Sequence, residues 1–336
     1  MSIHYNISLK GLTTFNVDYK AKYFLEIKDS NFLYDELYKN NLLDLEKIFL
    51  GEGSNLLFTR DYPGVVIKVK GDYIKIEKET SEEIYITVSG NFKWHNFVTF
   101  CVERNFYGVE NLALIPGSVG GAVVQNIGAY GVEVKTIIEK VICIDILSGK
   151  EKIFSKEECD FNYRSSLFKR ERNLFVKEST FILSKIKKLN LSYPGLKDSL
   201  KKISEELINA KDVFNAVCSI RRLKIPDPLI FPNAGSFFKN PIIEVKKFEK
   251  LKTDYPELVF FPLENNFIKL SAGWLIEKVN LKGKVINGAG TSPNHALVLI
   301  KYAEGKGEDV LNFANLIEKK VFEKFLIKLE REVEVI

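Results

Sequence analysis

The sequence predicts an α+β fold, and three observations support this class. Strand-like and helix-like segments alternate irregularly along the 336 residues instead of repeating as regular βαβ units. The length exceeds what one ordinary core accommodates, so two or three domains are expected. The composition, 46% hydrophobic and 28% charged, is that of a soluble globular protein and excludes disordered and collagen-like chains.

The first hundred residues carry several strand signals and one clear helix. Apolar runs or period-two alternation predict strands over 65–70, 72–77 and 84–89. From Trp94 onward, apolar residues recur at i, i+3, i+4, i+7 and i+8, which predicts an amphipathic helix. Asn91 is a candidate N-cap for this helix.

The remainder of the chain continues the mixture. Residues 141–147 are followed by a Ser-Gly turn and a second strand-like run, which predicts a hairpin, and residues 174–183 predict another strand. A helix that ends near Phe325 begins with Glu308 and Asp309, as its dipole favours. The closing LEREVEVI predicts a final strand. Domain boundaries are expected near residues 70 and 220, and the second lies between a lysine-rich stretch at 185–202 and a proline-rich stretch at 224–241.

Charge and hydropathy exclude several classes of function. Lys+Arg 49 against Asp+Glu 44 leaves a net charge of +5, spread along the chain without the basic stripe of a nucleic-acid binder. This small excess suits anionic ligands or ordinary solubility equally well. The N-terminal MSIHYNISLKGLTTF has no apolar signal core, and no run approaches the roughly 18 apolar residues of a membrane span. We therefore expect a cytoplasmic protein without a membrane association.

The cysteines and histidines indicate neither disulfides nor a metal. Cys101, Cys143, Cys159 and Cys218 are too sparse and too irregularly spaced for a disulfide framework or a zinc site. The chain has three histidines, which makes a metal centre improbable on composition. We expect four buried free thiols.

Two glycine-rich segments, 51–57 and 115–131, are the strongest chemical signal. Glycines let backbone N–H groups approach a phosphate closely, and the neighbouring Ser, Asn and Gln side chains suit a diphosphate or a polar ring edge. Neither segment is a P-loop, and Leu56 stands where a dinucleotide fingerprint needs its third glycine. Each segment could be a simple turn, but the composition of the second favours a ligand cradle.

These two segments, GEGSNLLF and IPGSVGGAVVQNIGAYG, closely resemble the flavin-binding segments of the UDP-N-acetylenolpyruvoylglucosamine reductase family. The resemblance continues in the family's order over essentially the whole chain. It covers TTFNVD, YRSSLFK, the segment around Tyr193, LKIPDP, NAGSFFKNP, SAGWLIE, HALVLI and LEREV. The Tyr193 segment resembles the family's first type, in which a tyrosine loop closes over the substrate.

The resemblance implies a domain plan. A two-part FAD-binding domain of the vanillyl-alcohol oxidase and p-cresol methylhydroxylase type would be accompanied by a separate α+β substrate-binding domain. We expect the FAD-binding parts at 1–70 and 71–220 and the substrate-binding domain at 221–325, with a C-terminal strand at 326–336 returning to the FAD and substrate interface.

The resemblance also implies an activity. Members of this family are oxidoreductases and flavoproteins of peptidoglycan precursor synthesis, and thus serve cell-wall biogenesis, cell shape and cell division. NADPH reduces FAD, which then reduces UDP-N-acetylglucosamine enolpyruvate to UDP-N-acetylmuramate, a D-lactyl ether. The expected partners are these small molecules, with no nucleic acid and no membrane, and the expected state is a monomer.

Three residues are expected to be catalytic by this resemblance. Arg164 is a planar permanent cation suited to a carboxylate or enolate, although a lone arginine is usually a surface residue. Ser236 has no hydrolase context and could simply cap a turn, whereas the family uses this serine as the acid that protonates the substrate carbon. Glu332 could be a solvated charge, whereas the family's glutamate helps to stabilise the carbanionic intermediate.

The resemblance further assigns binding residues. The expected cofactor contacts are Gly51, Gly53, Ser54, Asn55, Leu56, Ile115, Pro116, Gly117, Ser118, Gly120, Gly121, Gln125, Asn126, Gly128, Ala129 and Tyr130. The expected substrate contacts are Tyr163, Tyr193, Lys224, Asn240 and His295, of which His295 departs from the glutamine of many members.

Two other functions stay open at this stage. A related flavin oxidase would share the FAD domain but should lack NAGSFFKNP and LEREV. A non-catalytic nucleotide-binding protein with a decayed site is disfavoured by the intact set of Arg164, Ser236 and Glu332.

Overall fold

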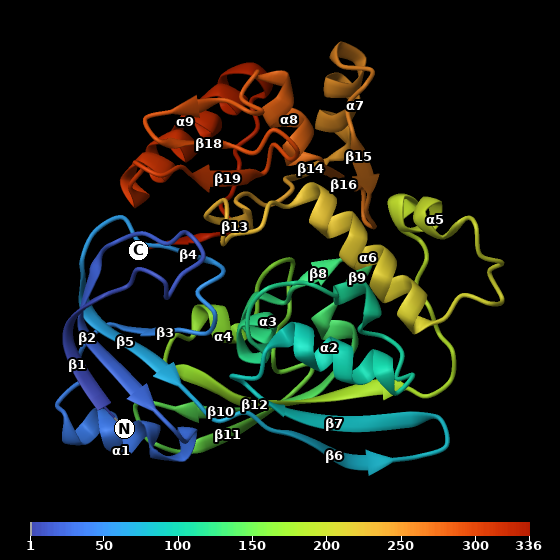
Figure 1. Cartoon of the computed structure of the whole chain (residues 1–336). Helices are drawn as coiled ribbons and strands as arrows, with labels where there is room; N and C mark the ends of the chain where they lie inside the picture. Colours follow the sequence, from blue (N-terminus) through green and yellow to red (C-terminus); the bar gives the residue numbers. More distant parts are fainter. Residues whose placement is uncertain (1) are drawn as a thin grey trace. The chain divides into compact units, whose positions relative to one another are not determined.

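The computed structural model describes residues 2–336 and confirms the α+β class (Figure 1). The chain divides into two compact units. Unit 1 comprises the N-terminal residues up to Ile7 together with Ala21–Glu52 and Pro63–Arg222. Unit 2 comprises Ser8–Lys20, Gly53–Tyr62 and Leu223–Ile336. The division at 70, 220 and 325 stays a prediction.

The first sheet of unit 1 is four-stranded, in the order β1-β2-β5-β3. Its strands are β1 (Ser2–Ser8), β2 (Lys20–Ile27), β3 (Lys47–Phe49) and β5 (Tyr62–Val69). Helix α1 (Leu33–Lys39) buries Leu33 and Leu37 in the hydrophobic cluster that also contains Leu25 and Ile67 of this sheet. The strand predicted over 65–70 is confirmed as the end of β5.

The second sheet of unit 1 has five strands in the order β11-β10-β12-β7-β6. Its strands are β6 (Ile74–Glu79), β7 (Glu83–Ser89), β10 (Ile138–Asp145), β11 (Glu151–Ser155) and β12 (Leu174–Ser184). All neighbouring pairs are antiparallel, which confirms the predicted hairpin and the strands near 72–77, 84–89 and 174–183.

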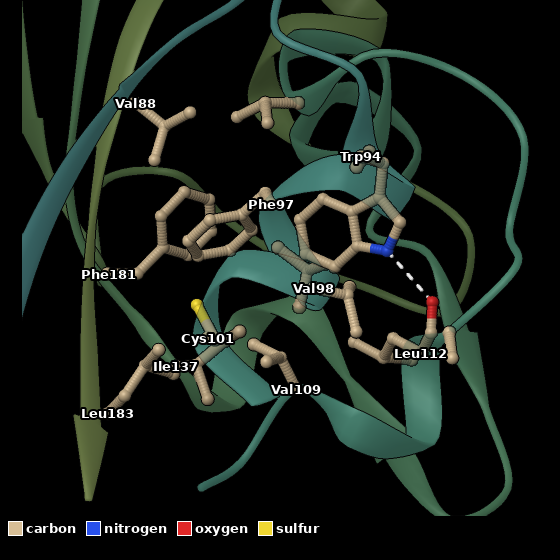
Figure 2. Packing of buried hydrophobic residues seen from close by; sticks show 14 of the residues in the cluster. Val88, Trp94, Phe97, Val98, Cys101, Val109, Leu112, Ile137, Phe181 and Leu183 are labelled. Carbon is tan, nitrogen blue, oxygen red and sulfur yellow. Dashed lines mark hydrogen bonds between the residues drawn. The ribbon is translucent and has the colours of Figure 1, made fainter. Parts of the chain in front are cut away.

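The core of unit 1 lies between this sheet and helix α2 (Trp94–Glu103) (Figure 2). Trp94 and Phe97 are fully buried, and both rings contact Phe181 of β12 at centroid distances of 6.0 and 4.7 Å. The predicted helix is confirmed, but the Asn91 cap is wrong. The helix begins after Lys93, and the carbonyl of Gly117, not a side chain, accepts from the Trp94 N–H at 2.9 Å.

The other elements of unit 1 are shorter. They are η1 (Ser30–Phe32), η2 (Glu110–Leu112), α3 (Val119–Gln125), β8 (Gly128–Ala129), β9 (Val132–Glu133), η3 (Val134–Thr136), α4 (Leu167–Arg170), α5 (Pro194–Leu200) and α6 (Ala210–Lys224), whose last two residues belong to unit 2. Helices α2 and α3 lie over the same face of the five-stranded sheet (Figure 1).

Unit 2 contains one four-stranded sheet, β13-β19-β18-β17, and a three-stranded sheet, β14-β16-β15. Their strands are β13 (Asn233–Ser236), β14 (Ile242–Glu244), β15 (Phe260–Pro262), β16 (Phe267–Leu270), β17 (Val285–Ile286), β18 (Ala289–Thr291) and β19 (Val298–Lys301). The helices are α7 (Val245–Asp254), α8 (Ala272–Lys278) and α9 (Gly307–Phe325). The predicted helix ending at Phe325 is confirmed, with Glu308 and Asp309 in its first turn.

The C-terminal strand is shorter than the sequence predicts. Strand β20 (Glu334–Val335) pairs in parallel with β4 (Leu56–Leu57). The preceding residues 330–333 bind residues 237–239 through separate backbone hydrogen bonds and one isolated bridge, so they form no continuous ladder.

All four cysteines are free and buried, as predicted. Burial raises the pKa of each thiol, which keeps these groups in the protonated form. Among residues 2–336, no helix is both long enough and apolar enough to cross a membrane.

Candidate functional site

The first residue of the first glycine-rich segment contacts the second segment within unit 1. A Cβ built on Gly51 would stand 2.7 Å from the Ser118 hydroxyl, so a larger residue at position 51 would displace that hydroxyl. The same hydroxyl accepts a hydrogen bond from the Gly121 N–H at 3.2 Å and thereby caps helix α3. The close approach shows that residue 51 and the start of α3 are parts of one arrangement rather than two independent turns.

Helix α2 positions the chain that leads into the second segment. The Trp94 indole donates to the Leu112 carbonyl at 2.9 Å (Figure 2), and the His95 ring accepts from the Leu114 N–H at 3.0 Å. Burial, followed by the charges of Arg222 and Arg221, lowers the pKa of His95, which favours the neutral ring that this contact requires. The hydrophobic core therefore fixes where the glycine-rich segment begins.

Two amides stand at the end of helix α3. Asn126 adopts a left-handed conformation with φ 43°, donates to the Asn162 carbonyl at 2.9 Å and accepts from the Lys135 N–H at 3.1 Å. Gln125 is 8% exposed, and its Oε1 accepts from the Lys169 ammonium at 2.6 Å. Its Nε2 is buried and has no hydrogen-bond partner among residues 2–336.

Arg164 binds the glycine-rich segment directly. Its Nη2 donates to the Gly128 carbonyl at 2.5 Å, its Nη1 lies 4.0 Å from a Glu133 carboxylate oxygen, and its side chain is 16% exposed. A Cβ on Gly128 would stand 2.9 Å from Nη1, so a larger residue at position 128 would displace the guanidinium. The backbone of Arg164 has φ 53°, a costly conformation for a residue with a long side chain.

The loop that carries Tyr193 contacts the second glycine-rich segment, 115–131, through a ring contact and hydrogen bonds. The Tyr193 ring meets the Tyr130 ring edge-on, with centroids 5.0 Å apart. The buried Asn111 donates from Nδ2 to the carbonyls of Tyr130 and Asn190, at 2.9 Å each. Asn190 in turn donates to the Gly131 carbonyl at 3.1 Å. The structure thus joins the expected cofactor segment and the expected substrate loop through two asparagines.

In unit 2, backbone hydrogen bonds bring together the segments that carry Ser236 and Glu332. Ser236 ends β13 opposite Val298. The next residue, Phe237, accepts from the N–H of Glu332 at 2.8 Å. Asn55 completes the arrangement, because its Nδ2 donates to the Glu332 carbonyl at 3.1 Å.

Three predicted substrate contacts lie elsewhere in unit 2. The Asn240 Oδ1 accepts from the first N–H of helix α8 at 2.9 Å. His295 begins the turn before β19, where its Nδ1 accepts from the Leu297 N–H at 3.3 Å and the Leu297 carbonyl accepts from Phe237. Lys224 is exposed at the end of α6. His295 therefore neighbours the Ser236 segment in the fold.

The remaining predicted residues follow the same division between the units. Gly51, Ile115, Pro116, Gly117, Ser118, Gly120, Gly121, Ala129, Tyr130 and Tyr163 are in unit 1, whereas Gly53, Ser54 and Leu56 are in unit 2. Tyr163 lies beside Arg164, whose guanidinium carbon is 5.2 Å from its ring centroid.

Sequence reasoning did not assign Lys169, Asn111 or Asn190. Lys169 stands in the YRSSLFK motif, so its place beside Arg164 was a usable signal. Asn111 comes just before the glycine-rich segment and Asn190 just before Tyr193. Nothing in their local sequences indicates that they meet, because that contact depends on the tertiary fold.

Family models match both parts of the chain. A model of the FAD binding domain matches residues 39–154, and a model of the UDP-N-acetylenolpyruvoylglucosamine reductase C-terminal domain matches residues 227–336. The fold also matches the crystal structure of UDP-N-acetylenolpyruvylglucosamine reductase from Thermus caldophilus, with a TM-score of 0.70 over 100% of this chain and 99% of that one, at 23% identity. These matches define an FAD-containing oxidoreductase.

Curated relatives identify the family. UDP-N-acetylenolpyruvoylglucosamine reductase of Flavobacterium johnsoniae is 40% identical over 100% of both chains. The enzymes of Bacteroides fragilis and Buchnera aphidicola are 38% and 42% identical over 98% of this chain, and over 98% and 95% of their own lengths. The chain belongs to the UDP-N-acetylenolpyruvoylglucosamine reductase family.

The residues present in unit 1 fit FAD. Glycine at position 51 leaves the Ser118 hydroxyl and the start of α3 in place beside the first glycine-rich segment, where backbone N–H groups can approach a phosphate. The buried Gln125 Nε2 is a donor without an acceptor in the described chain, and such an atom is explained by a polar ligand. Flavin rings and diphosphates both supply acceptors. In the same residues, no cluster of His, Cys, Asp or Glu is arranged to hold a metal ion.

Proposed function

We propose that this chain is a cytoplasmic, monomeric flavoenzyme that uses NADPH to reduce UDP-N-acetylglucosamine enolpyruvate to UDP-N-acetylmuramate. The geometric observation that carries the proposal is the contact between Arg164 and Gly128. It sets a permanent cation against the segment that fits FAD, where a carboxylate-bearing substrate can be bound and polarised.

The glycine-rich residues of both segments would hold FAD, which would supply the hydride chemistry that links NADPH to C3 of the enolpyruvyl group. Arg164 stabilises the negative charge that develops at C2 and its carboxylate, together with Glu332. Ser236 donates its hydroxyl proton to C2, which completes the D-lactyl ether. The reaction is accelerated because these groups stabilise the enolate-like transition state more than they stabilise the bound substrate.

The chain's own residues meet the requirements of these roles. An alcohol is a weak acid in water. The Ser236 hydroxyl therefore has to be held in a fixed position, with few other hydrogen-bond partners that compete for its proton. Its place at the end of β13 is fixed by backbone pairing with β19. Tyr163, Tyr193, Lys224, Asn240 and His295 are proposed to bind the sugar nucleotide, and the glycine-rich residues of both segments are proposed to bind FAD.

The proposal is tested with the purified protein. We expect a yellow flavin spectrum and NADPH oxidation that depends on the enolpyruvyl sugar nucleotide, with one NADPH consumed for each UDP-N-acetylmuramate formed. A related flavin oxidase would instead consume oxygen with NADPH-independent turnover of another substrate. A colourless protein, or NADPH oxidation unaffected by the sugar nucleotide, would contradict the proposal.

A further inference from the structure

The side-chain amide of Gln125 is buried, and its two ends differ. Oε1 accepts from the Lys169 ammonium at 2.6 Å, whereas Nε2 is buried without a partner among the described residues. A buried amide donor left without an acceptor is costly, so such donors are seldom retained without a reason.

Lys169 decides which end of this amide is available. An ammonium group donates hydrogen bonds and cannot accept them, so the atom of Gln125 that faces it must be the oxygen. The nitrogen is then forced to the other side. The orientation of the amide, which is ambiguous in most structures, is here determined by the chemistry of its neighbour.

Lys169 also reaches the residue proposed to polarise the substrate. Its ammonium lies 3.3 Å from the Arg164 carbonyl, at the left-handed backbone that aims the guanidinium toward Gly128. Lys169 belongs to the one-turn helix α4 (Leu167–Arg170), which begins three residues after Arg164. One ammonium therefore contacts both Gln125 and the backbone of Arg164.

We infer that Lys169 is a positioning residue that holds the Gln125 amide with its N–H groups directed at an acceptor on the bound FAD. It touches neither FAD nor substrate and acts through Gln125. The inference rests on the proposed function because it takes FAD as the ligand that supplies the acceptor. A donor held in this way binds FAD more tightly, and it stabilises the reduced, more negative flavin more than the oxidised one.

The test is a double-mutant cycle read out as FAD binding to the apoprotein. Lys169→Met keeps the length of the side chain without the ammonium, and Gln125→Met removes the amide. We expect Lys169→Met to raise the dissociation constant of FAD about three- to tenfold, as the loss of one hydrogen bond implies. In the Gln125→Met background, Lys169→Met should have little further effect, because the group through which it acts is absent.

Further variants separate positioning from a merely structural role. Gln125→Glu keeps the contact with Lys169 but has no N–H to donate, so it should weaken FAD binding and lower the flavin midpoint potential. Lys169→Arg should restore FAD binding, because it donates to the same oxygen. The exposed Lys150→Met is the matched control and should bind FAD as the wild type does. If Lys169→Met does not fold, Lys169→Leu, which also lacks the ammonium, takes its place in the cycle.

Two results would overturn the inference. One is an equal loss of FAD affinity from Lys169→Met in the wild-type and Gln125→Met backgrounds, since that would show an effect independent of Gln125. The other is unchanged FAD affinity and potential in Gln125→Glu, which would assign the Nε2 group to a buried water. Failure of the proposed function is distinguishable from both, because it would appear as NADPH oxidation of the wild type that is independent of the sugar nucleotide, and it would leave the comparison of FAD affinities among the variants unchanged.

Discussion

In unit 1, side chains hold the site together, whereas in unit 2 the backbone does. Arg164 and Asn111 reach carbonyls of the glycine-rich segment, Tyr130 among them, through guanidinium and amide groups. Glu332, by contrast, is placed by hydrogen bonds between the backbones of residues 237–239 and 330–333. Side-chain changes should therefore disturb the first arrangement strongly and the second weakly, unless they remove a reacting group itself.

The largest effect in unit 1 is expected from Arg164→Gln. The substitution removes the permanent cation and the fixed contact with Gly128 while leaving the glycine-rich segment in place. Turnover of the sugar nucleotide should fall roughly 10²–10³-fold, the usual cost of losing one donor to a developing negative charge. Steady-state kinetics measure this effect, and anaerobic NADPH addition shows whether the flavin is still reduced.

The surface residue Arg170 provides the control for Arg164. Its guanidinium pairs with Asp160, and both side chains are largely exposed. Arg170→Gln should leave turnover unchanged, since exposed ion pairs contribute little. Equal losses in the two variants would show that general charge, and not the placement of Arg164, is responsible.

A smaller effect is expected from Asn111→Ala. The change removes both hydrogen bonds that tie Tyr130 to the loop carrying Tyr193. We expect the KM for the sugar nucleotide to rise about tenfold with little change in kcat, because roughly 1.4 kcal/mol of loop ordering is lost. Hydrogen exchange of residues 190–193 should become faster, whereas the exposed Asn173→Ala should alter neither quantity.

Asn55→Ala tests the backbone-held site of unit 2. Asn55 contributes one side-chain hydrogen bond to the Glu332 carbonyl, but the Phe237 carbonyl still binds the Glu332 N–H in the variant. Turnover should therefore fall only about two- to fivefold, well below the effect of Arg164→Gln. Asn312→Ala, on the exposed face of α9, is the control. If Asn55→Ala lowers turnover as much as Arg164→Gln does, the proposed difference between the side-chain-held site of unit 1 and the backbone-held site of unit 2 is wrong.

The smallest effect concerns pH and stability. Burial lowers the pKa of His95, so the folded protein binds its proton less readily than the unfolded chain. Stability should therefore fall as pH drops below about 6.5, the ordinary histidine value. Protonation would oppose the hydrogen bond from Leu114, which is worth about 1 kcal/mol.

Urea denaturation at pH 7.5 and 5.5 measures this pH dependence. His95→Gln should lose less stability than the wild type between the two pH values, because its side chain has no charge to gain. The control is His4→Gln, because His4 is exposed on β1. This variant should lose as much stability between the two pH values as the wild type does. If His95→Gln and the wild type lose the same free energy of unfolding between pH 7.5 and pH 5.5, groups other than His95 cause the pH dependence.

The sequence was most informative where a local pattern determines the structure. The spacing of Trp94, Phe97 and Val98 predicts a buried helical face, and that face is the core of unit 1. The Asn91 cap failed because the first N–H of the helix is taken by the carbonyl of Gly117, a tertiary contact that local sequence does not encode.

The same limit applies to the site. Motifs named Arg164, Ser236 and Glu332 as a set, but no pattern shows that Arg164 binds Gly128 or that Asn55 binds Glu332. The latter pair is separated by 277 positions in the chain. Contacts of this kind depend on the tertiary fold, so the residues that position the site were found in the structure.

The division of roles between NADPH oxidation and protonation of the substrate is the central claim, and Ser236→Ala tests it most directly. The two half-reactions are followed separately by anaerobic stopped-flow measurement of the flavin absorbance. Reduction of the flavin by NADPH should proceed at nearly the wild-type rate, while reoxidation by the enolpyruvyl sugar nucleotide should slow by several orders of magnitude. Equal losses in both half-reactions, or reoxidation at the wild-type rate, would contradict the assignment of Ser236 as the proton donor.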